Sequence, residues 1–365
     1  MKKLQILGIR GVPAAHGGFE TFAEYLALYL VDRGWDVTVY CQEEGNGGIS
    51  ESEWCGVKRV HIPIAGDGPK STVLFDYKSV IESCNRDGLI LTLGYNTAIL
   101  NAIYRLRGKT NLINMDGIEW RRGKWGAIAK AWFYLNERFG CWFGNHLIAD
   151  HPDIKAHLAS RVSQSKITMI PYGAEPVFQA DVKLLDAYGL VPNNYGVLIA
   201  RAEPENSILE AVQAFSCKRR NRKLVVLGKY EPENNAYHRA VMAAASDEVV
   251  FVGAIYEKPI VNALRHFARF YVHGHQVGGT NPSLVEALGA CSPVLAHDNV
   301  FNRWVAGDAA EYFSDAASCS ERLDQLFSDD GRVEEMRISA RARFEKQFTW
   351  DRILREYEAL LLKWL

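Results

Sequence analysis

Residues 272–288, VHGHQVGGTNPSLVEAL, run from an apolar strand through a glycine-rich turn into a predicted helix. Asn281 suits the N-cap and Pro282 the first helical position. Free backbone amides at such a helix start bind anions and hydroxyl groups without a metal. Glu286, one turn into the helix, would accept hydrogen bonds from sugar hydroxyls; an ordinary exposed glutamate is the alternative. The turn before the N-cap contributes three further candidates: Gly278, Gly279 and Thr280.

Two cations follow apolar strands in the same half of the chain. Arg201 ends the predicted strand 195–201, and Lys229 comes directly after 223–228. A guanidinium at the carboxyl end of a strand suits a bidentate grip on a diphosphate. Lys229 would add charge stabilisation to a leaving diphosphate. A surface ion pair is the alternative for Arg201.

The first loop of the chain, residues 10–19, has the sequence RGVPAAHGGF. It departs from Gly-x-Gly-x-x-Gly, and the next strand, 36–41, ends in Tyr-Cys without an acidic residue, which weighs against a dinucleotide site. Gly17 and Gly18, directly before a predicted helix, would let the backbone approach a phosphate or a sugar closely. A flexible turn explains the same glycines equally well.

Two carboxylates follow the predicted strand 111–116. Asp116 at the strand's end is a candidate to orient or deprotonate an acceptor hydroxyl, and Glu119 is its rival for that role. An Asx-turn is the alternative reading of Asp116.

Residues 105–138 carry eight basic and three acidic side chains in a chain whose net charge is −1. Tryptophans and a phenylalanine are interleaved with them: Trp120, Trp125, Trp132, Phe133 and Trp142. Basic residues with tryptophans suit a helix lying on anionic lipid, so residues 105–143 are a candidate for peripheral membrane contact. Core aromatics beside a solvated basic face are the alternative.

The elements that would position these residues alternate strand and helix in two series. Apolar strands separated by helical segments predict parallel sheets covered on both faces, and thus two Rossmann-like domains facing a central cleft. The boundary falls at Pro-Tyr-Gly, which gives domains of residues 1–175 and 176–348. The amphipathic segment 349–365 is expected to pack back on the first domain, and 43–53 to form an exposed loop. The second series contains five predicted strands: 195–201, 223–228, 248–253, 269–274 and 292–297.

Composition excludes several classes of function. The 365 residues are 48% hydrophobic and 23% charged, with no basic excess for nucleic acid. No uncharged run reaches the roughly 18–20 residues of a membrane span. The seven scattered cysteines favour a reduced, cytoplasmic chain. No Asp-x-Asp, no cluster with metal-ligand spacing and no Gly-x-Ser-x-Gly occurs, so neither a metal, a cofactor nor hydrolase chemistry is expected.

Arg201 and the Asn-Pro-Ser-Leu-Val-Glu-Ala-Leu helix, on two such domains, resemble the GT-B glycosyltransferases of family 4 over nearly the whole chain. The resemblance implies that the first domain binds the acceptor and the second a nucleotide sugar. It also implies that Glu286 contacts the ribose and Arg201 the diphosphate. The chain departs from the family pattern at two positions. Gly278 stands where the first glutamate of the family's Glu-x7-Glu is expected, and Asn206 stands where a lysine is expected after the first strand of the second domain.

Five segments together are similar to a bacterial rhamnosyltransferase subgroup: IRGVPAAHGGFETFAE, INMDGIEWRRGKW, IPYGAE, ARAEPENSILEA and GGTNPSLVEAL. The resemblance implies transfer of L-rhamnose from dTDP-L-rhamnose to a lipid-linked saccharide in surface polysaccharide synthesis. Retention of anomeric configuration is implied too, with the departing phosphate taking the acceptor proton, and a location on the inner face of the cytoplasmic membrane.

Three alternatives stay open at this point. The donor could be another nucleotide sugar, such as a UDP- or GDP-hexose. A GT-B nucleotide-sugar epimerase would convert the donor without an acceptor. A non-catalytic binding subunit would keep the fold but lack chemistry, and it is prompted by Gly278 and Asn206.

Overall fold

The computed structural model describes residues 2–15 and 17–365. The chain divides into two compact units. The first unit comprises residues 1–172 together with 350–365, and the second unit comprises residues 173–349.

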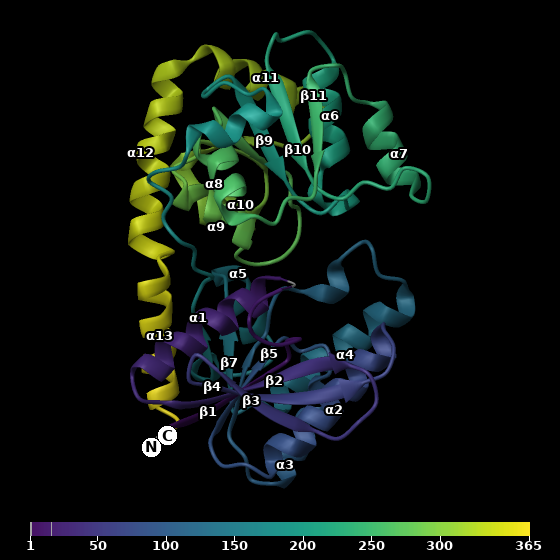
Figure 1. Ribbon diagram of the computed structural model, residues 1–365, viewed down its shortest axis with the longest axis vertical. Helices are drawn as coiled ribbons and strands as arrows, with labels where there is room; N and C mark the ends of the chain where they lie inside the picture. The colour runs from purple at the N-terminus through teal and green to yellow at the C-terminus, as the bar shows by residue number, and fades with distance from the viewer. Residues whose placement is uncertain (1, 16) are drawn as a thin grey trace. The chain divides into compact units, whose positions relative to one another are not determined.

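The first unit is built on an eight-stranded sheet in the order β3-β4-β2-β1-β5-β6-β7-β8 (Figure 1). All neighbouring pairs are parallel except β3 with β4. The strands are β1 (Lys3–Leu7), β2 (Asp36–Glu44), β3 (Ser50–Trp54), β4 (Val57–Ile64), β5 (Leu89–Leu93), β6 (Asn111–Asn114), β7 (His146–Ala149) and β8 (Ile167–Met169). The expectation of a loop over 43–53 is wrong at both ends, because β2 extends to Glu44 and β3 begins at Ser50, and both strands pair with β4.

The helices of the first unit cover both faces of this sheet. They are α1 (Gly18–Asp32), α2 (Pro69–Cys84), α3 (Asn101–Leu106), α4 (Ala127–Phe143), α5 (Pro152–Ala159) and α13 (Trp350–Leu362), with 3-10 turns at Ala98–Leu100, Glu119–Arg121 and Gln164–Lys166. Helix α1 ends because Gly34 adopts φ +75°, a conformation that favours glycine. Its buried stripe packs with β1 and α13 in one apolar core, while α2 and α3 contribute to a second core.

Helix α13 is an integral part of the first unit. Phe22 of α1 lies with its ring centroid 4.5 Å from that of Tyr357, and Tyr25 stacks on Trp350 at 4.6 Å. The Tyr357 hydroxyl accepts a hydrogen bond from Asn114 Nδ2 at 2.8 Å, beside the end of β6. The last residues of the chain therefore support the strand that leads to Asp116.

The second unit is built on a six-stranded parallel sheet in the order β11-β10-β9-β12-β13-β14. The strands are β9 (Tyr195–Ile199), β10 (Lys223–Leu227), β11 (Val249–Gly253), β12 (Phe270–His273), β13 (Val294–His297) and β14 (Ala310–Phe313). Five of them match the predicted strands. The sixth, β14, has only four residues and pairs at the edge with β13.

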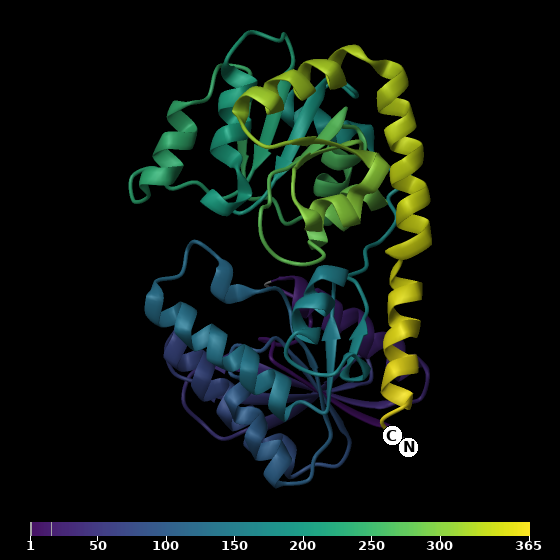
Figure 2. The ribbon, with the colours of Figure 1, turned by 180° about the vertical axis from the view of Figure 1, so that it is seen from behind.

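Helices cover both faces of the second sheet, as Figures 1 and 2 show. They are α6 (Ile208–Ser216), α7 (Ala236–Ala243), α8 (Lys258–His266), α9 (Pro282–Gly289), α10 (Val300–Ala306), α11 (Ala316–Ser328) and α12 (Asp330–Gln347), with 3-10 segments at Val182–Tyr188, Pro204–Asn206 and Gly307–Ala309. Helices α8 and α9 contribute to one core, and α6 and α11 to the other.

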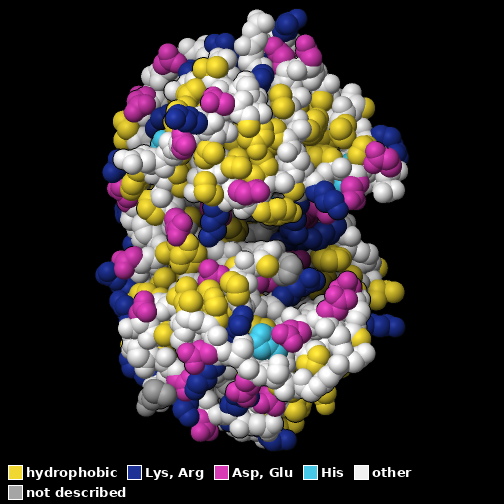
Figure 3. All heavy atoms as spheres, viewed as in Figure 1, with side chains coloured by type: hydrophobic (Ala, Val, Ile, Leu, Met, Phe, Trp, Pro, Cys, Tyr) yellow, Lys and Arg dark blue, Asp and Glu magenta, His cyan; other side chains and the backbone are white. Residues whose placement is uncertain are grey.

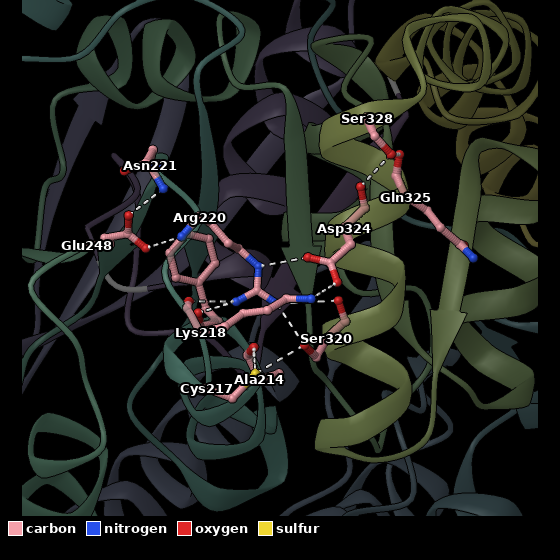
Figure 4. A network of polar contacts seen from close by, with 11 residues as sticks. Ala214, Cys217, Lys218, Arg220, Asn221, Glu248, Ser320, Asp324, Gln325 and Ser328 are labelled. Carbon is pink, nitrogen blue, oxygen red and sulfur yellow. Dashed lines mark hydrogen bonds and ion pairs between the residues drawn. The ribbon is translucent and has the colours of Figure 1, made fainter.

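A polar network at the amino edge of this second sheet ties α6 to α11 (Figure 4). Arg220 Nη2 donates to Ser320 Oγ at 2.7 Å, and Lys218 Nζ pairs with Asp324 at 2.5 Å. The Glu248 carboxylate accepts from the backbone amides of Arg220 and Asn221 at 2.8 and 2.5 Å. The network therefore fixes the loop into β10 at the edge opposite to the candidate site.

Within the described ranges, no helix is both long enough and apolar enough to cross a membrane. On the face drawn in Figure 3, basic and acidic side chains are interspersed over each unit, in line with a net charge of −1.

Candidate functional site

In the second unit, the structure brings Arg201 and the glycine-rich turn to one edge of the sheet. Strands β9 and β12 are parallel neighbours, with Tyr271 opposite Val197. Arg201 follows β9 and residues 274–281 follow β12, so both loops leave the sheet at its carboxyl edge. In parallel α/β sheets this edge is where ligands bind.

Asn206 joins these two loops. Its Nδ2 donates to the Arg201 carbonyl at 2.8 Å, and its Oδ1 lies 2.5 Å from His275 Nδ1. Gly274 lies so close that a Cβ there would come within 2.0 Å of the Asn206 carbonyl oxygen. Both polar atoms of the Asn206 amide are therefore used inside the protein, and the residue that stands in place of a family lysine holds the two loops together.

Helix α9 begins as its sequence predicts. Asn281 is the N-cap, and its Oδ1 accepts from the Ser283 amide at 3.0 Å, with Pro282 at the first helical position. Thr280, directly before the cap, is buried. Gly278 has φ +125°, a conformation that L side chains rarely adopt, and a Cβ there would contact His275 Nε2 at 3.3 Å. A glutamate at 278 would therefore be strained in this loop.

Glu286 pairs with a residue that sequence reasoning missed. Its Oε2 lies 2.6 Å from Nη2 of Arg265 on α8, a side chain that is only 6% exposed. The same Arg265 nitrogen donates to Ser283 Oγ at 3.1 Å, and that hydroxyl lies 2.7 Å from the Tyr271 hydroxyl. Glu286 is thus held in place from α8. Its Oε1 has no hydrogen-bond partner among the described residues.

The two candidate cations of the second unit differ. Arg201 is exposed, and among the described residues no side chain pairs with its guanidinium. Lys229 forms an ion pair with Glu231 at 2.6 Å, and its side chain is 76% exposed. This partner raises the pKa of Lys229. Arg201 is therefore the cation better placed to meet an anionic ligand.

A buried histidine lies at the end of β12. Burial, together with the nearby His275 and Arg265, lowers the pKa of His273 well below its usual value, so the imidazole is neutral at pH 7. Its Nε2 has no hydrogen-bond partner among the described residues. The HGH sequence marks this spot, but nothing in the sequence distinguishes a buried histidine from a surface one.

In the first unit, Gly17 is the N-cap of α1 and has no side-chain cap, and Gly18 is the first helical residue. Carboxylates of α1 already hold the loop before them. Glu24 Oε2 accepts from the Ala14 amide at 2.6 Å, and Glu20 Oε1 accepts from the Arg10 amide at 3.3 Å. These negative charges oppose an anion and favour a neutral ligand at Gly17 and Gly18.

Asp116 and Glu119 lie together after β6. Asp116 has φ +52°, which an aspartate tolerates better than most residues, and its amide donates to Asn114 Oδ1 at 3.0 Å. Glu119 is buried and pairs with Arg122 at 2.6 Å. Burial and the neighbouring Asp116 charge raise the pKa of Glu119. The Glu119 amide donates to the Tyr95 hydroxyl at 2.8 Å, which ties this corner to the loop after β5.

The interleaved aromatic side chains divide into two sets. Trp120 donates to Glu137 at 2.8 Å and Trp125 packs on Phe133, so these half-buried rings hold the loop against α4. The rest of α4 leaves an apolar stripe at helical spacing on the surface: Ile128, Trp132, Leu135 and Trp142. We call these four residues the α4 stripe.

Within residues 2–15 and 17–365, no group of three or more His, Cys, Asp or Glu side chains is placed to hold a metal ion.

Comparison with protein families divides the chain close to the same boundary as the structure, but neither match includes residues 350–365. Residues 191–343 match the family described as glycosyl transferases group 1, and residues 1–175 match a domain of unknown function, DUF1972. A search of curated proteins found no match.

Solved structures share the whole fold. Sucrose-phosphate synthase from Thermosynechococcus elongatus aligns with a TM-score of 0.85 at 17% identity, covering 100% of this chain and 99% of that one. Anabaena HepE in complex with UDP aligns at 0.76 and 14% identity, covering 100% of both chains. An α,α-trehalose-phosphate synthase (UDP-forming) from Burkholderia vietnamiensis aligns at 0.76 and 10% identity, again over 100% of both. The fold is GT-B. Residues 191–343 carry the match to glycosyl transferases group 1, and this match supports a hexosyltransferase.

Proposed function

We propose that this enzyme takes a nucleoside diphosphate sugar as donor and binds it at the carboxyl edge of the second sheet. One observation carries this proposal. Arg201, whose guanidinium has no side-chain partner among the described residues, follows β9, and the adjacent strand β12 leads to the start of α9, which carries the fixed Glu286. Arg201 and the α9 amides would neutralise the diphosphate, and Glu286 would accept from a sugar hydroxyl of the nucleoside. The UDP bound by Anabaena HepE, on the same fold, supports this donor class.

The finer proposal is L-rhamnose carried on dTDP. Two observations support it beside the resemblance of the five segments. Arg265 occupies one oxygen of Glu286, which leaves Oε1 for the single free hydroxyl of a deoxyribose. Gly278 stands where an acid would contact the donor sugar, and a 6-deoxy sugar offers one hydroxyl fewer to hold.

We propose that the acceptor is a lipid-linked saccharide bound by the first unit. Asp116 would orient its hydroxyl, and Glu119, paired with Arg122, would support that corner. In the retaining reaction that the family resemblance implies, the departing phosphate takes the hydroxyl proton. Asp116 then acts by positioning rather than as a base.

The α4 stripe supports peripheral contact with a membrane on its cytoplasmic face. Ile128 is 90% exposed, Leu135 51% and Trp142 55%. Lys130 and Arg138 lie on the same helix, and Leu106 on α3, which packs against α4, is also exposed. Apolar side chains flanked by cations match the chemistry of an anionic lipid surface, where a lipid-linked acceptor resides.

The test of the donor site combines a ligand screen with two variants. Thermal stabilisation by dTDP, UDP and GDP, and by their sugars, identifies the donor, and we expect dTDP-L-rhamnose to stabilise most. Arg201→Ala and Glu286→Ala are expected to lower transfer at least about a hundredfold. Arg201→Ala should leave Tm unchanged because Arg201 is exposed, whereas Glu286→Ala also removes the partner of the buried Arg265 and should lower Tm. Arg219→Ala, an exposed arginine at the opposite edge of the same sheet, is the control.

Normal turnover by both variants would refute the site, and a preference for GDP would refute rhamnose. Nucleotide binding with no transfer to any acceptor would favour a binding subunit, whereas donor conversion without acceptor would favour an epimerase.

A further inference from the structure

The first unit contains a cavity of its own, which no candidate residue named so far explains. It has a volume of about 240 Å³ and lies where β1, β2 and β5 end, under α2. This is below the roughly 300–1,000 Å³ of sites for drug-sized molecules, and suits a single sugar ring. The same edge of the sheet leads to Asp116, because β6 is the next strand after β5 and the Gly94 amide donates to the Asn114 carbonyl at 2.9 Å.

Polar side chains in the cavity wall are incompletely satisfied. Asp76 on α2 accepts from Thr97 Oγ1 at 2.7 Å, through Oδ2. Ser79 Oγ and Asn101 Nδ2 are buried, and neither has a hydrogen-bond partner among the described residues. Buried polar groups are costly without partners, so this wall is ready to exchange hydrogen bonds with a ligand. The donors and acceptors together match hydroxyl groups, which can act as both.

The rest of the wall gives the cavity its apolar and charged character. Phe75, Val80 and Leu93 are buried side chains that form apolar surface for the carbon skeleton of a ligand. The charged lining consists of Asp76 and Glu20 against one cation, Arg10. The two carboxylates would repel a phosphate, and that of Glu20 already accepts a hydrogen bond from the Arg10 amide at 3.3 Å.

We propose that this cavity is the acceptor site, and that it takes one neutral, hydroxyl-rich sugar unit rather than a sugar phosphate, with Asp76 accepting from a sugar hydroxyl. The inference rests on the proposed function, which it deepens by giving the acceptor its chemical class. It assigns a role to the half of the chain that matches only a domain of unknown function. It also separates this enzyme from its sucrose-phosphate and trehalose-phosphate synthase neighbours, whose names denote phosphorylated products.

Saturation-transfer NMR on the full-length protein with bound nucleotide tests the proposal directly. The probes are methyl α-D-glucopyranoside, methyl α-L-rhamnopyranoside and methyl N-acetyl-α-D-glucosaminide, with glucose 6-phosphate as the charged comparison. We expect at least one methyl glycoside to bind and glucose 6-phosphate to bind more weakly than all three. Asp76→Asn is expected to weaken the bound glycoside about tenfold, the effect of losing a hydrogen bond to a charged group.

Asp67→Asn is the matched control, since Asp67 is exposed just before α2 and outside the cavity. Tighter binding of glucose 6-phosphate, no binding of any glycoside, or unchanged affinity in Asp76→Asn would each overturn the acceptor assignment. Thermal stabilisation by nucleotide, measured on the same samples, reports the donor site separately. Its absence in the unmodified protein would refute the proposed function, whereas its presence with a failed glycoside assay refutes this inference alone.

Discussion

Glu286 owes its orientation to a side chain 21 positions earlier in the chain, and this pairing has a measurable consequence. Arg265→Met would release Glu286 Oε2 and remove the donor to Ser283. We expect dTDP affinity to fall about tenfold, because a hydrogen bond to a charged group is lost. We also expect the preference to shift toward UDP, since two free carboxylate oxygens can meet both hydroxyls of a ribose.

Calorimetric titration of both nucleotides measures this ratio, which a purely structural role of Arg265 would leave unmoved. Arg341→Met is the control, because Arg341 forms an exposed pair with Glu345. An unchanged ratio of dTDP to UDP affinity would show that Arg265 does not position Glu286.

Asp76 makes the stability of the first unit depend on pH. Burial raises the pKa of Asp76 from 3.8 to about 6, against the opposing effect of its hydrogen bond from Thr97. The folded state therefore binds the proton more tightly than the unfolded state, and stability falls as pH rises from about 4 to about 6. Asp76→Asn removes this loss. We expect the variant to match the unmodified protein at pH 4 and to be more stable by up to about 3 kcal/mol at pH 7.5.

Thermal unfolding at the two pH values checks this expectation. Asp67→Asn, at an exposed position, is the control, and its stability relative to the unmodified protein should be the same at both pH values. A variant that is less stable at pH 7.5 would mean that the Asp76 charge is compensated in the folded protein.

The residues of the candidate site differ in how far sequence reveals them. Asn281 and Pro282 are local sequence signals for the start of a helix, and the predicted start of α9 is confirmed. Arg265 carries no local signal, because its partnership with Glu286 arises only when α8 and α9 pack together. The partners of Asn206 are likewise set by the approach of two loops that lie about 70 residues apart in the chain.

At the scale of single elements, α4 is unusual because its solvent-exposed face carries the apolar α4 stripe. Replacing Ile128 and Leu135 by serine should reduce binding to phosphatidylglycerol-containing vesicles at least about tenfold, since each buried aliphatic side chain contributes roughly 1.5–3 kcal/mol. Tm should change little, because both side chains are exposed. Vesicle co-sedimentation measures the effect.

Ile338→Ser is the matched control for that experiment, because Ile338 is similarly exposed but lies on α12 in the second unit. Equal loss of vesicle binding in the control, or none in the double variant, would argue against the α4 stripe as a lipid-binding surface.

Elements with continuous apolar runs were predictable, and those without were not. Strands β9, β10, β12 and β13 of the second sheet are largely buried, and together with the half-buried edge strand β11 they read as apolar runs. Strand β3, SESEW, lies at the sheet edge and exposes polar side chains, so its pattern indicates a loop. Strand β14, AEYF, lies at the edge of the second sheet and leaves Glu311 and Tyr312 half-buried, so it forms no continuous apolar run.

At the scale of the whole molecule, the chain returns to the first unit at its end, so α13 stabilises residues 1–172 and not the second unit that directly precedes it in sequence. Tyr357 is buried among Phe22 and the other core residues of the first unit, and its hydroxyl binds Asn114. Tyr357→Ala should therefore cost the first unit roughly 3–5 kcal/mol, the usual loss for a large aromatic core residue. Among the described residues, none from α13 belongs to either apolar core of the second unit.

Differential scanning calorimetry with and without dTDP separates the two units. A nucleotide bound to the second unit should raise the transition of that unit, whereas Tyr357→Ala should lower the other transition. Tyr357→Phe keeps the ring and loses only the hydrogen bond from Asn114, so it should lower the unfolding free energy of the first unit by about 1 kcal/mol. If Tyr357→Ala instead lowered the nucleotide-sensitive transition, the helix would stabilise the donor-binding unit, and the division of the chain at residues 172 and 350 would be wrong in solution.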